Sequence, residues 1–270
     1  MLQTPLAYQY VVTLAMISQV NYYALRMHLP INVPVKEQDI RFLNASRPNN
    51  NRYSARIQVK NYSFTFSGES LSIYNLADDG LQSFGIPMEL GESSRSGMER
   101  ASRMRYIVST NDVYRMATNW LVALDIDLEK LEAANPPCVN KYPIFHSERG
   151  LVPNPLLIVD WKNTNAPGYD PTEVTVEISA VSGELLKLTD SGSFGKRGEQ
   201  PLIKDLNNLL AISDEQFLKY STLERSNLVV RFTSLHCSDL HCPGVDDPIS
   251  PETNAVSHVS QITNSTAKQN

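Results

Sequence analysis

The chain has 270 residues, of which 41% are hydrophobic and 20% charged, as in a globular protein long enough for one large domain or two small ones. Its formal net charge of -5 gives no general attraction to nucleic acid, so neither RNA nor DNA is expected as a partner. No apolar run approaches the roughly 18 to 20 residues that a membrane-spanning helix needs.

The first residues and the three cysteines leave the compartment open. Residues 1–14 lack the basic start and the uninterrupted apolar stretch of a secretory signal. The chain is therefore either cytoplasmic or shown without its export segment. Cys138, Cys237 and Cys242 make an odd number, which fits a reducing compartment slightly better than an oxidising one.

A helix is predicted from Pro5 to Met27. Thr4 can cap this helix, and Pro5 suits the first helical position because that position needs no backbone N–H. Apolar residues recur at helical spacing through the segment, and Pro30 and Pro34 prevent its continuation.

Strands are predicted next, at residues 53–59, 62–66 and 71–76, because apolar and polar residues alternate there. The sequence Ser67-Gly68-Glu69 supplies the turn of a hairpin. Residues 80–97 are polar, contain glycine and are expected to form a loop.

A second helix is predicted after Ser109, which together with Asp112 resembles a capping box. Its apolar stripe consists of Val113, Ala117, Trp120, Leu121 and Leu124. Asp125 or Asp127 is expected to cap a short helical continuation that ends at Pro136.

Strands resume at residues 156–161 and 173–181, and the turn Ser182-Gly183-Glu184 leads into a strand at 185–188. The sequence SGELLKL, which starts at Ser182, parallels SGESLSI, which starts at Ser67. The helical sequences VYRMAT and VVTLAM, from the second and first predicted helices, run parallel as well. These parallels indicate a duplicated unit. The predicted fold is therefore α+β, with two similar halves that each pack an amphipathic helix on a small antiparallel sheet.

The predicted domain limits follow from this duplication. The first helix-plus-hairpin half spans residues 1–97 and the second spans 98–235. The second half includes helices at 201–211 and from Ser213, and a final strand at 228–232. Residues 236–270 are expected to form a flexible tail, because the chain from Pro243 onward is polar and lacks periodicity.

The sequence ISAVSGELL at Ile178–Leu186 resembles the strand and turn of a PepSY-type unit, a cystatin-like packing of helix on sheet. The resemblance covers Asn111–Leu188 and, more faintly, Pro5–Leu76. The helix at Ala117–Asp127 is also similar to one found in uncharacterised bacterial proteins that are usually exported. Such proteins are usually non-catalytic, and PepSY domains are linked to inhibiting or chaperoning peptidases. The resemblance therefore implies a protein or peptide partner.

The residues with the strongest metal-binding chemistry are His236, Cys237, His241 and Cys242. Two imidazoles and two thiolates are ligands that zinc prefers, but four ligands within seven residues lack the longer insert of known structural sites. A local disulfide between the two cysteines is an alternative, and an ordinary surface segment is the interpretation that we favour. Under that interpretation the protein has no cofactor, and zinc is the cofactor that the cluster would otherwise bind.

Other candidate clusters carry weaker signals. His146 and Ser147, with Asp160 downstream, are the residue types of a hydrolase triad, but adjacent residues point in different directions. Residues 192–198 combine glycines with cations but lack the spacing of a phosphate-binding loop. Cys138 follows two prolines and has no signature of an activated thiol.

The preferred functional hypothesis is a non-catalytic protein- or peptide-binding or structural module. Two related sheets side by side leave a groove or an exposed edge, where an extended peptide could add as a strand. One alternative is a metal or redox role centred on the cluster from His236 to Cys242. A second alternative is a hydrolase whose site residues are dispersed in the sequence and meet only in the fold.

Overall fold

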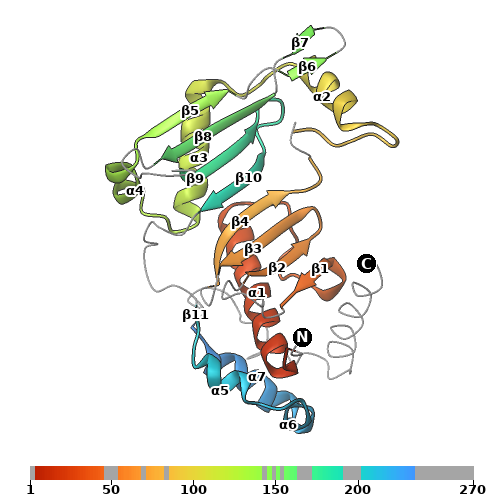
Figure 1. Cartoon of the computed structure of the whole chain (residues 1–270), viewed down its shortest axis with the longest axis vertical. Helices are drawn as coiled ribbons and strands as arrows, with labels where there is room; N and C mark the ends of the chain where they lie inside the picture. The colour runs from red at the N-terminus through yellow and green to blue at the C-terminus, as the bar shows by residue number, and fades with distance from the viewer. Residues whose placement is uncertain are drawn as a thin grey trace. The chain divides into compact units, whose positions relative to one another are not determined.

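The structure is a computed structural model that describes residues 4–45, 54–67, 71–81, 85–141, 145–147, 150–152, 155–162, 172–190 and 202–234. Runs of helices and runs of antiparallel strands follow one another along the chain, so the predicted α+β class is confirmed (Figure 1). The chain divides into two compact units. Unit 1 consists of residues 1–60, 65–72 and 199–270, and unit 2 of residues 61–64 and 73–198. None of the described helices is long and apolar enough to span a membrane.

Unit 1 is built around a long helix, α1. Its other elements are short helices and strands from both ends of the chain. The bounds are α1 Leu6–Arg26, β1 Ile40–Asn44, β2 Ser54–Val59, the last residues of β3 Tyr62–Ser67, β11 Leu202–Ile203, α5 Leu206–Leu210, α6 Asp214–Lys219, α7 Thr222–Phe232 and β12 Thr233–Ser234.

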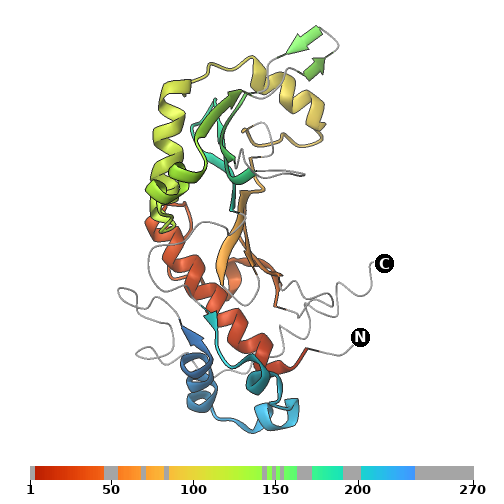
Figure 2. The ribbon, with the colours of Figure 1, turned by 60° about the vertical axis from the view of Figure 1, so that its left-hand side comes forward.

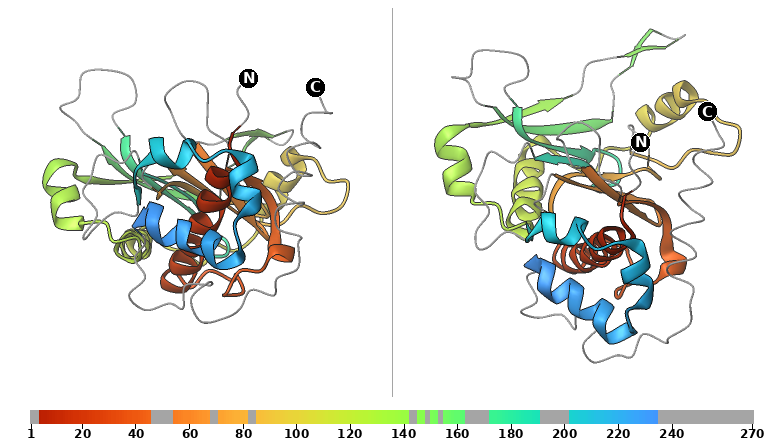
Figure 3. Two further views of the ribbon diagram at one scale, coloured as in Figure 1. Left: turned by 90° about the horizontal axis from the view of Figure 1, so that it is seen from below. Right: turned by 60° about the horizontal axis from the view of Figure 1, so that its bottom comes forward.

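The helix α1 is the centre of the unit 1 core. Its apolar residues are buried along most of its length, and it contacts β2 as well as α5, α6 and α7. Figure 3 shows the three C-terminal helices gathered around α1. The ring of Phe217 in α6 lies 5.5 Å from that of Tyr10 in α1. Helices more than 180 residues apart in the sequence thus share one apolar core.

The start of α1 differs from the prediction. Pro5 is the N-cap residue, and no side chain at that position caps the helix. The backbone N–H of Leu6 instead donates to Oδ1 of Asp214, at 2.8 Å. A carboxylate is well suited to this place, because the N-terminal end of a helix carries partial positive charge. The cap of the first helix therefore comes from α6, near the other end of the chain.

Two C-terminal segments also differ from the prediction. Residues 228–232 form the end of α7 and not a strand. The reason is local, because Ser221 and Glu224 form a capping box at the start of α7. Leu228 and Phe232, four residues apart, are then buried on one helical face. Upstream, the predicted helix at 201–211 is shorter, because Leu202–Ile203 pairs with β12 before α5 begins.

Unit 2 packs helices against a sheet whose strand order is β4-β10-β9-β8-β5, with every neighbouring pair antiparallel. Its bounds are β4 Ser72–Asp78, α2 Ser94–Ser102, α3 Thr110–Ala123, α4 Leu128–Ala134, β5 Pro137–Lys141, β6 Phe145–Ser147, β7 Gly150–Val152, β8 Leu156–Lys162, β9 Thr172–Ser179 and β10 Leu185–Asp190. The helix α2 starts inside the region that was expected to be a loop. The strands β6 and β7 form a separate small hairpin.

The helix α3 lies along one face of this sheet (Figure 2). Val113, Ala117 and Leu121 are buried beneath it, as the predicted apolar stripe requires. On the facing strands Val159, Trp161, Val174, Val176 and Leu188 are fully buried. Because side chains alternate along a strand, the residues between them point to the opposite face.

Local capping signals in unit 2 are confirmed. The Ser109 hydroxyl accepts the N–H of Asp112 at 3.2 Å and caps α3. Of the two predicted alternatives for α4, Asp127 is the cap, accepting the N–H of Lys130 at 3.2 Å. The turn between β9 and β10 contains Gly183 with φ +77°, the left-handed conformation that glycine favours. The matching turn predicted at residues 67–69 lies largely outside the described residues.

Candidate peptide-binding edge

The strand β5 ends the sheet of unit 2. It pairs with β8 over five consecutive residues without a register shift, and among the described strands it pairs with no other. Pro137, Cys138 and Val139 are exposed, and Val139 retains 37% of its accessible surface. The residues from Pro137 to Asn140 carry no charge. An edge strand of this kind presents unpaired backbone N–H and C=O groups to solvent.

A polar network holds β5 to β8 on the face opposite α3. Asp160 of β8 is 8% exposed, and its carboxylate accepts hydrogen bonds from two neighbouring strands. Asn140 Nδ2 donates to Oδ2 at 3.0 Å, and the hydroxyl of Thr175 donates to Oδ1 at 3.0 Å. Lys162 Nζ lies 3.4 Å from the same carboxylate. Because these groups join three strands, Asp160 fixes the edge strand to the interior of the sheet.

The next row of this polar face carries a second carboxyl group, Glu177 of β9. Burial raises its pKa, and the negative charge of Asp160 raises it further. The ammonium of Lys187 on β10, at 3.6 Å from Glu177, acts in the opposite direction. Each carboxylate on this face thus has a lysine beside it.

Aromatic side chains hold β5 and β8 from the α3 side. Trp161 of β8 is fully buried and pairs in register with Pro137. Its indole N–H donates to Oε1 of Glu132 in α4, at 3.4 Å. The hydroxyl of Tyr114 in α3 donates to the same oxygen, and this hydrogen bond raises the pKa of Tyr114 to about 12. One carboxylate oxygen therefore ties α3, α4 and β8 together.

The thiol of Cys138 belongs to this edge. It is exposed, and its Sγ donates to Oδ1 of Asn140 on the same strand, at 3.4 Å. Alternation along β5 places Cys138 and Asn140 on the polar face and Val139 on the α3 face. The edge therefore offers different chemistry on its two sides.

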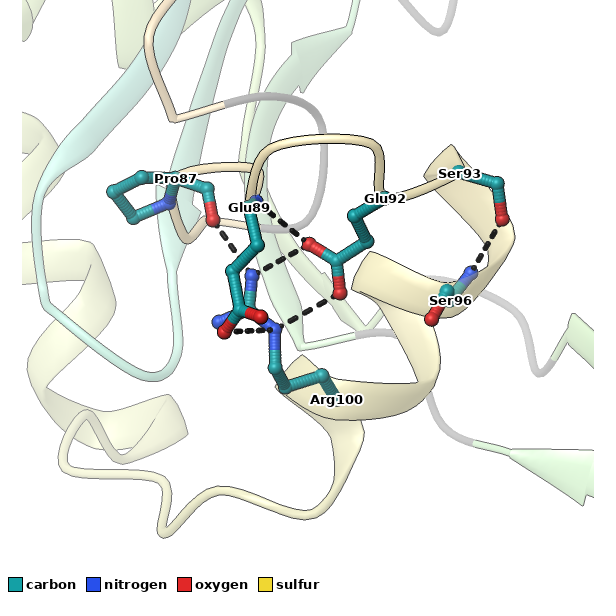
Figure 4. A network of polar contacts seen from close by, with 6 residues as sticks. All are labelled: Pro87, Glu89, Glu92, Ser93, Ser96 and Arg100. Atoms are coloured by element: carbon teal, nitrogen blue, oxygen red, sulfur yellow. Dashed lines mark hydrogen bonds and ion pairs between the residues drawn. The ribbon is translucent and has the colours of Figure 1, made fainter.

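The other tight polar network of unit 2 surrounds Arg100 (Figure 4). Its guanidinium donates to both carboxylate oxygens of Glu92, at 3.0 and 2.7 Å, and to the carbonyl of Pro87 at 2.7 Å. Glu89 lies 3.4 Å away. The hydrogen bond from Arg100 lowers the pKa of Glu92 to about 2. This network fixes the turn that leads into α2, and Leu90 at the tip of that turn is fully exposed.

A further buried carboxyl, Asp78, accepts hydrogen bonds from its own turn and from β3. It accepts the N–H of Gly80 at 2.8 Å and the hydroxyl of Tyr62. Burial raises the pKa of Asp78, and both hydrogen bonds oppose that rise. These contacts indicate a structural role at the end of β4.

The predicted metal ligands His236, Cys237, His241 and Cys242 lie outside the described residues, as does the glycine-rich segment 192–198. Of the proposed triad types, Asp160 belongs to the polar network above, and His146 lies in β6, whose side chains the structure does not describe. Among the described residues no group of three or more His, Cys, Asp or Glu side chains is placed to hold a metal ion.

Comparisons with protein-family models, with curated proteins and with solved structures found no match for this chain. The PepSY-like resemblance and the duplication of two halves therefore stay predictions. Glu132 and Tyr114 were not recognised as candidate site residues from the sequence. Glu132 lies 18 residues from Tyr114 and 29 from Trp161, so no local motif brings the three residues together.

Proposed function

We propose that this protein is a non-catalytic binding module that takes an extended segment of a partner protein as an added strand along β5. The observation that carries the proposal is the edge itself, which is regular, exposed from Pro137 to Val139 and uncharged from Pro137 to Asn140. In strand addition, main-chain hydrogen bonds supply affinity and alternate side chains supply specificity. Both elements of recognition are available on β5.

The two networks that flank β5 support the proposal. Asp160 holds the strand from the polar face, and the contacts of Trp161 hold β8 from the α3 face. An edge that is already ordered loses little conformational entropy when a segment adds to it. Most of the conformational entropy lost on binding is then that of the partner segment, as for an extended peptide that binds a preformed sheet edge.

The experiment uses the full chain and a displayed library of random linear peptides. Selected peptides are titrated into isotope-labelled protein while amide hydrogen exchange is followed by NMR. We expect slowed exchange at alternate amides among Cys138, Val139, Asn140 and Lys141, because only alternate N–H groups of an edge strand face the added strand. The amides of β1, Ile40–Asn44, serve as the internal control and should be unaffected.

The ligand side of the same experiment is N-methylation of the peptide backbone. The residues of the peptide form two alternating sets, the odd-numbered and the even-numbered. N-methylation of one set should weaken binding by at least about tenfold, because it removes ladder hydrogen bonds. N-methylation of the other set should change affinity little. Equal sensitivity of both sets, or protection away from β5, would overturn the proposal.

A further inference from the structure

Glu132 occupies a defined place relative to the edge. Its Oε1 accepts from the indole N–H of Trp161, which pairs in register with Pro137. Pro137 and Trp161 are neighbours across the ladder on the α3 face, so the carboxylate of Glu132 lies at the Pro137 end of β5 on that face. Any strand added beside β5 would extend past this carboxylate.

Among the described residues, the partners of Glu132 carry no positive charge. The hydroxyl of Tyr114 and the indole N–H of Trp161, which donate to it, are neutral. No ion pair joins Glu132 to a lysine, arginine or histidine among the side chains that the structure describes. Glu132 is only partly exposed, and a carboxylate in such a place gains from a cationic partner. The carboxylates on the polar face differ, because Asp160 and Glu177 each have a lysine nearby.

From these observations we infer that the segment added along β5 carries a lysine or arginine opposite Pro137, and that this cation pairs with Glu132. The inference rests on the proposed function and names the chemistry of its partner. Side chains directly opposite each other in a sheet project to the same face, so the residue facing Pro137 extends toward Glu132. Cys138, Val139 and Asn140 are uncharged, so we expect no charge preference at the residues of the added segment that lie opposite them.

A purely structural role for Glu132 predicts that the charge of the side chain does not affect peptide binding. If the carboxylate only joins α4 to α3 and β8, a neutral hydrogen-bond acceptor would serve equally well. Glu132→Gln keeps an oxygen that can accept from Tyr114 and Trp161 while removing the charge. The variant should therefore unfold at nearly the same denaturant concentration as the parent chain. Glu129→Gln, on the exposed side of the same helix, is the matched control.

The test uses the peptides selected on the full chain. We expect lysine or arginine to be enriched at one position, and replacement of that residue by citrulline or glutamine to weaken binding about tenfold. Glu132→Gln should weaken the parent peptide by a similar factor and remove the preference for arginine over citrulline. Glu129→Gln should leave both unchanged. The citrulline peptide needs no protein variant, so its result stands even if Glu132→Gln folds poorly.

The outcomes separate this inference from the proposed function. Protection of alternate β5 amides without any preference for a cation would overturn the inference and leave strand addition standing. A cation preference that Glu132→Gln does not change would also overturn it. No protection at β5 by any selected peptide would overturn both.

Discussion

The strands β1 and β5 both have an outer edge without a described partner strand, and they differ in the register and the charge of that edge. In β1 the register to β2 shifts between Ile40 and Phe42, and Arg41 lies at that irregularity. The guanidinium of Arg56 in β2 also lies over the ring of Phe42, 5.5 Å from the ring centroid, which is within the limit of about 6 Å for a cation–π interaction. In β5 five residues pair with β8 without a shift, and the first four are uncharged.

Bulges and charges are devices that keep sheet edges from pairing with other chains. The strand β1 has both, whereas β5 carries protecting residues only at its two ends, a proline at its first position and a lysine at its last. The middle of β5 is therefore the less protected backbone. Under the proposed function, we therefore expect strand addition at β5 and not at β1.

The largest expected effect comes from removing the carboxylate that holds β5 in place. Asp160→Ala should lower the free energy of unfolding by about 2–3 kcal/mol, because the partly buried Asn140 amide and Thr175 hydroxyl lose their acceptor. Urea denaturation measures this loss. Amide exchange in β5 should accelerate as well, while exchange in β1 stays unchanged.

Asp160→Asn is the matched variant, since it keeps one acceptor oxygen and removes the charge. The loss in free energy of unfolding caused by Asp160→Asn should lie between zero and the loss caused by Asp160→Ala. The pKa of Glu177 should fall in both variants, because the charge of Asp160 contributes to raising it. A chain with Asp160→Ala that unfolds within about 0.5 kcal/mol of the parent would show that the network does not hold the edge.

The next effect is smaller and depends on pH. Tyr114→Phe should lower the free energy of unfolding by about 1 kcal/mol near neutral pH, because it removes the hydrogen bond to Glu132. The pKa of Tyr114 is raised from 10.0 to about 12 in the folded protein. A pKa raised by folding gives stability that is complete below the unfolded value and is lost as the pH rises through the folded value.

The difference in stability between the parent and Tyr114→Phe should therefore be constant below about pH 10 and decrease between pH 10 and 12. Denaturation of both proteins at a series of pH values measures it, and the comparison cancels the titration of the other tyrosines. A difference that stays constant up to pH 12 would show that Tyr114 does not titrate through this hydrogen bond.

The smallest effect on stability tests the edge most directly. Val139→Lys should change the free energy of unfolding by less than about 0.5 kcal/mol, because Val139 is an exposed side chain. It should nevertheless reduce peptide binding several-fold, since a lysine on an edge opposes strand addition and shares the face of Glu132. Peptide titration measures the loss.

Arg41→Thr in β1 is the opposite change. It removes a charge from the protected edge but leaves the bulge between Ile40 and Phe42. No peptide binding should appear at β1. Binding gained there would show that charge alone, and not the irregular register, keeps β1 closed.

Local features of the fold were accessible from the sequence. The caps at Ser109 and Asp127 each need only a side chain and a backbone N–H three residues later, so their signals lie within one helical turn. The hairpin of β9 and β10 follows from alternation and one glycine turn. Residues 228–232 were misread because their apolar, β-branched character suits a strand as well as a helix, and Val230 is in fact 69% exposed.

The candidate site was less accessible. Trp161 lies in a strand that the sequence predicted, but its hydrogen bond to Glu132 joins elements that are distant in the sequence. The position of β5 at an edge depends on the order of all the strands in the sheet, which no local pattern in Pro137–Lys141 contains. The sequence led to the hypothesis that a groove or an exposed edge binds a peptide, but it could not indicate which strand lies at an edge.

The hydrogen bond from Leu6 to Asp214 has a consequence for how the chain acquires its structure during synthesis. The helix α1 is made early, yet its capping carboxylate and the helices that contact it are made last. Nearly all residues of unit 2 leave the ribosome in between, because unit 1 is interrupted by them. The part of the apolar face of α1 that contacts α5, α6 and α7 therefore lacks these partners while about 180 residues are translated. A chain arrested before α6 would expose that face, and such nascent chains are the ones on which a chaperone would be expected to act.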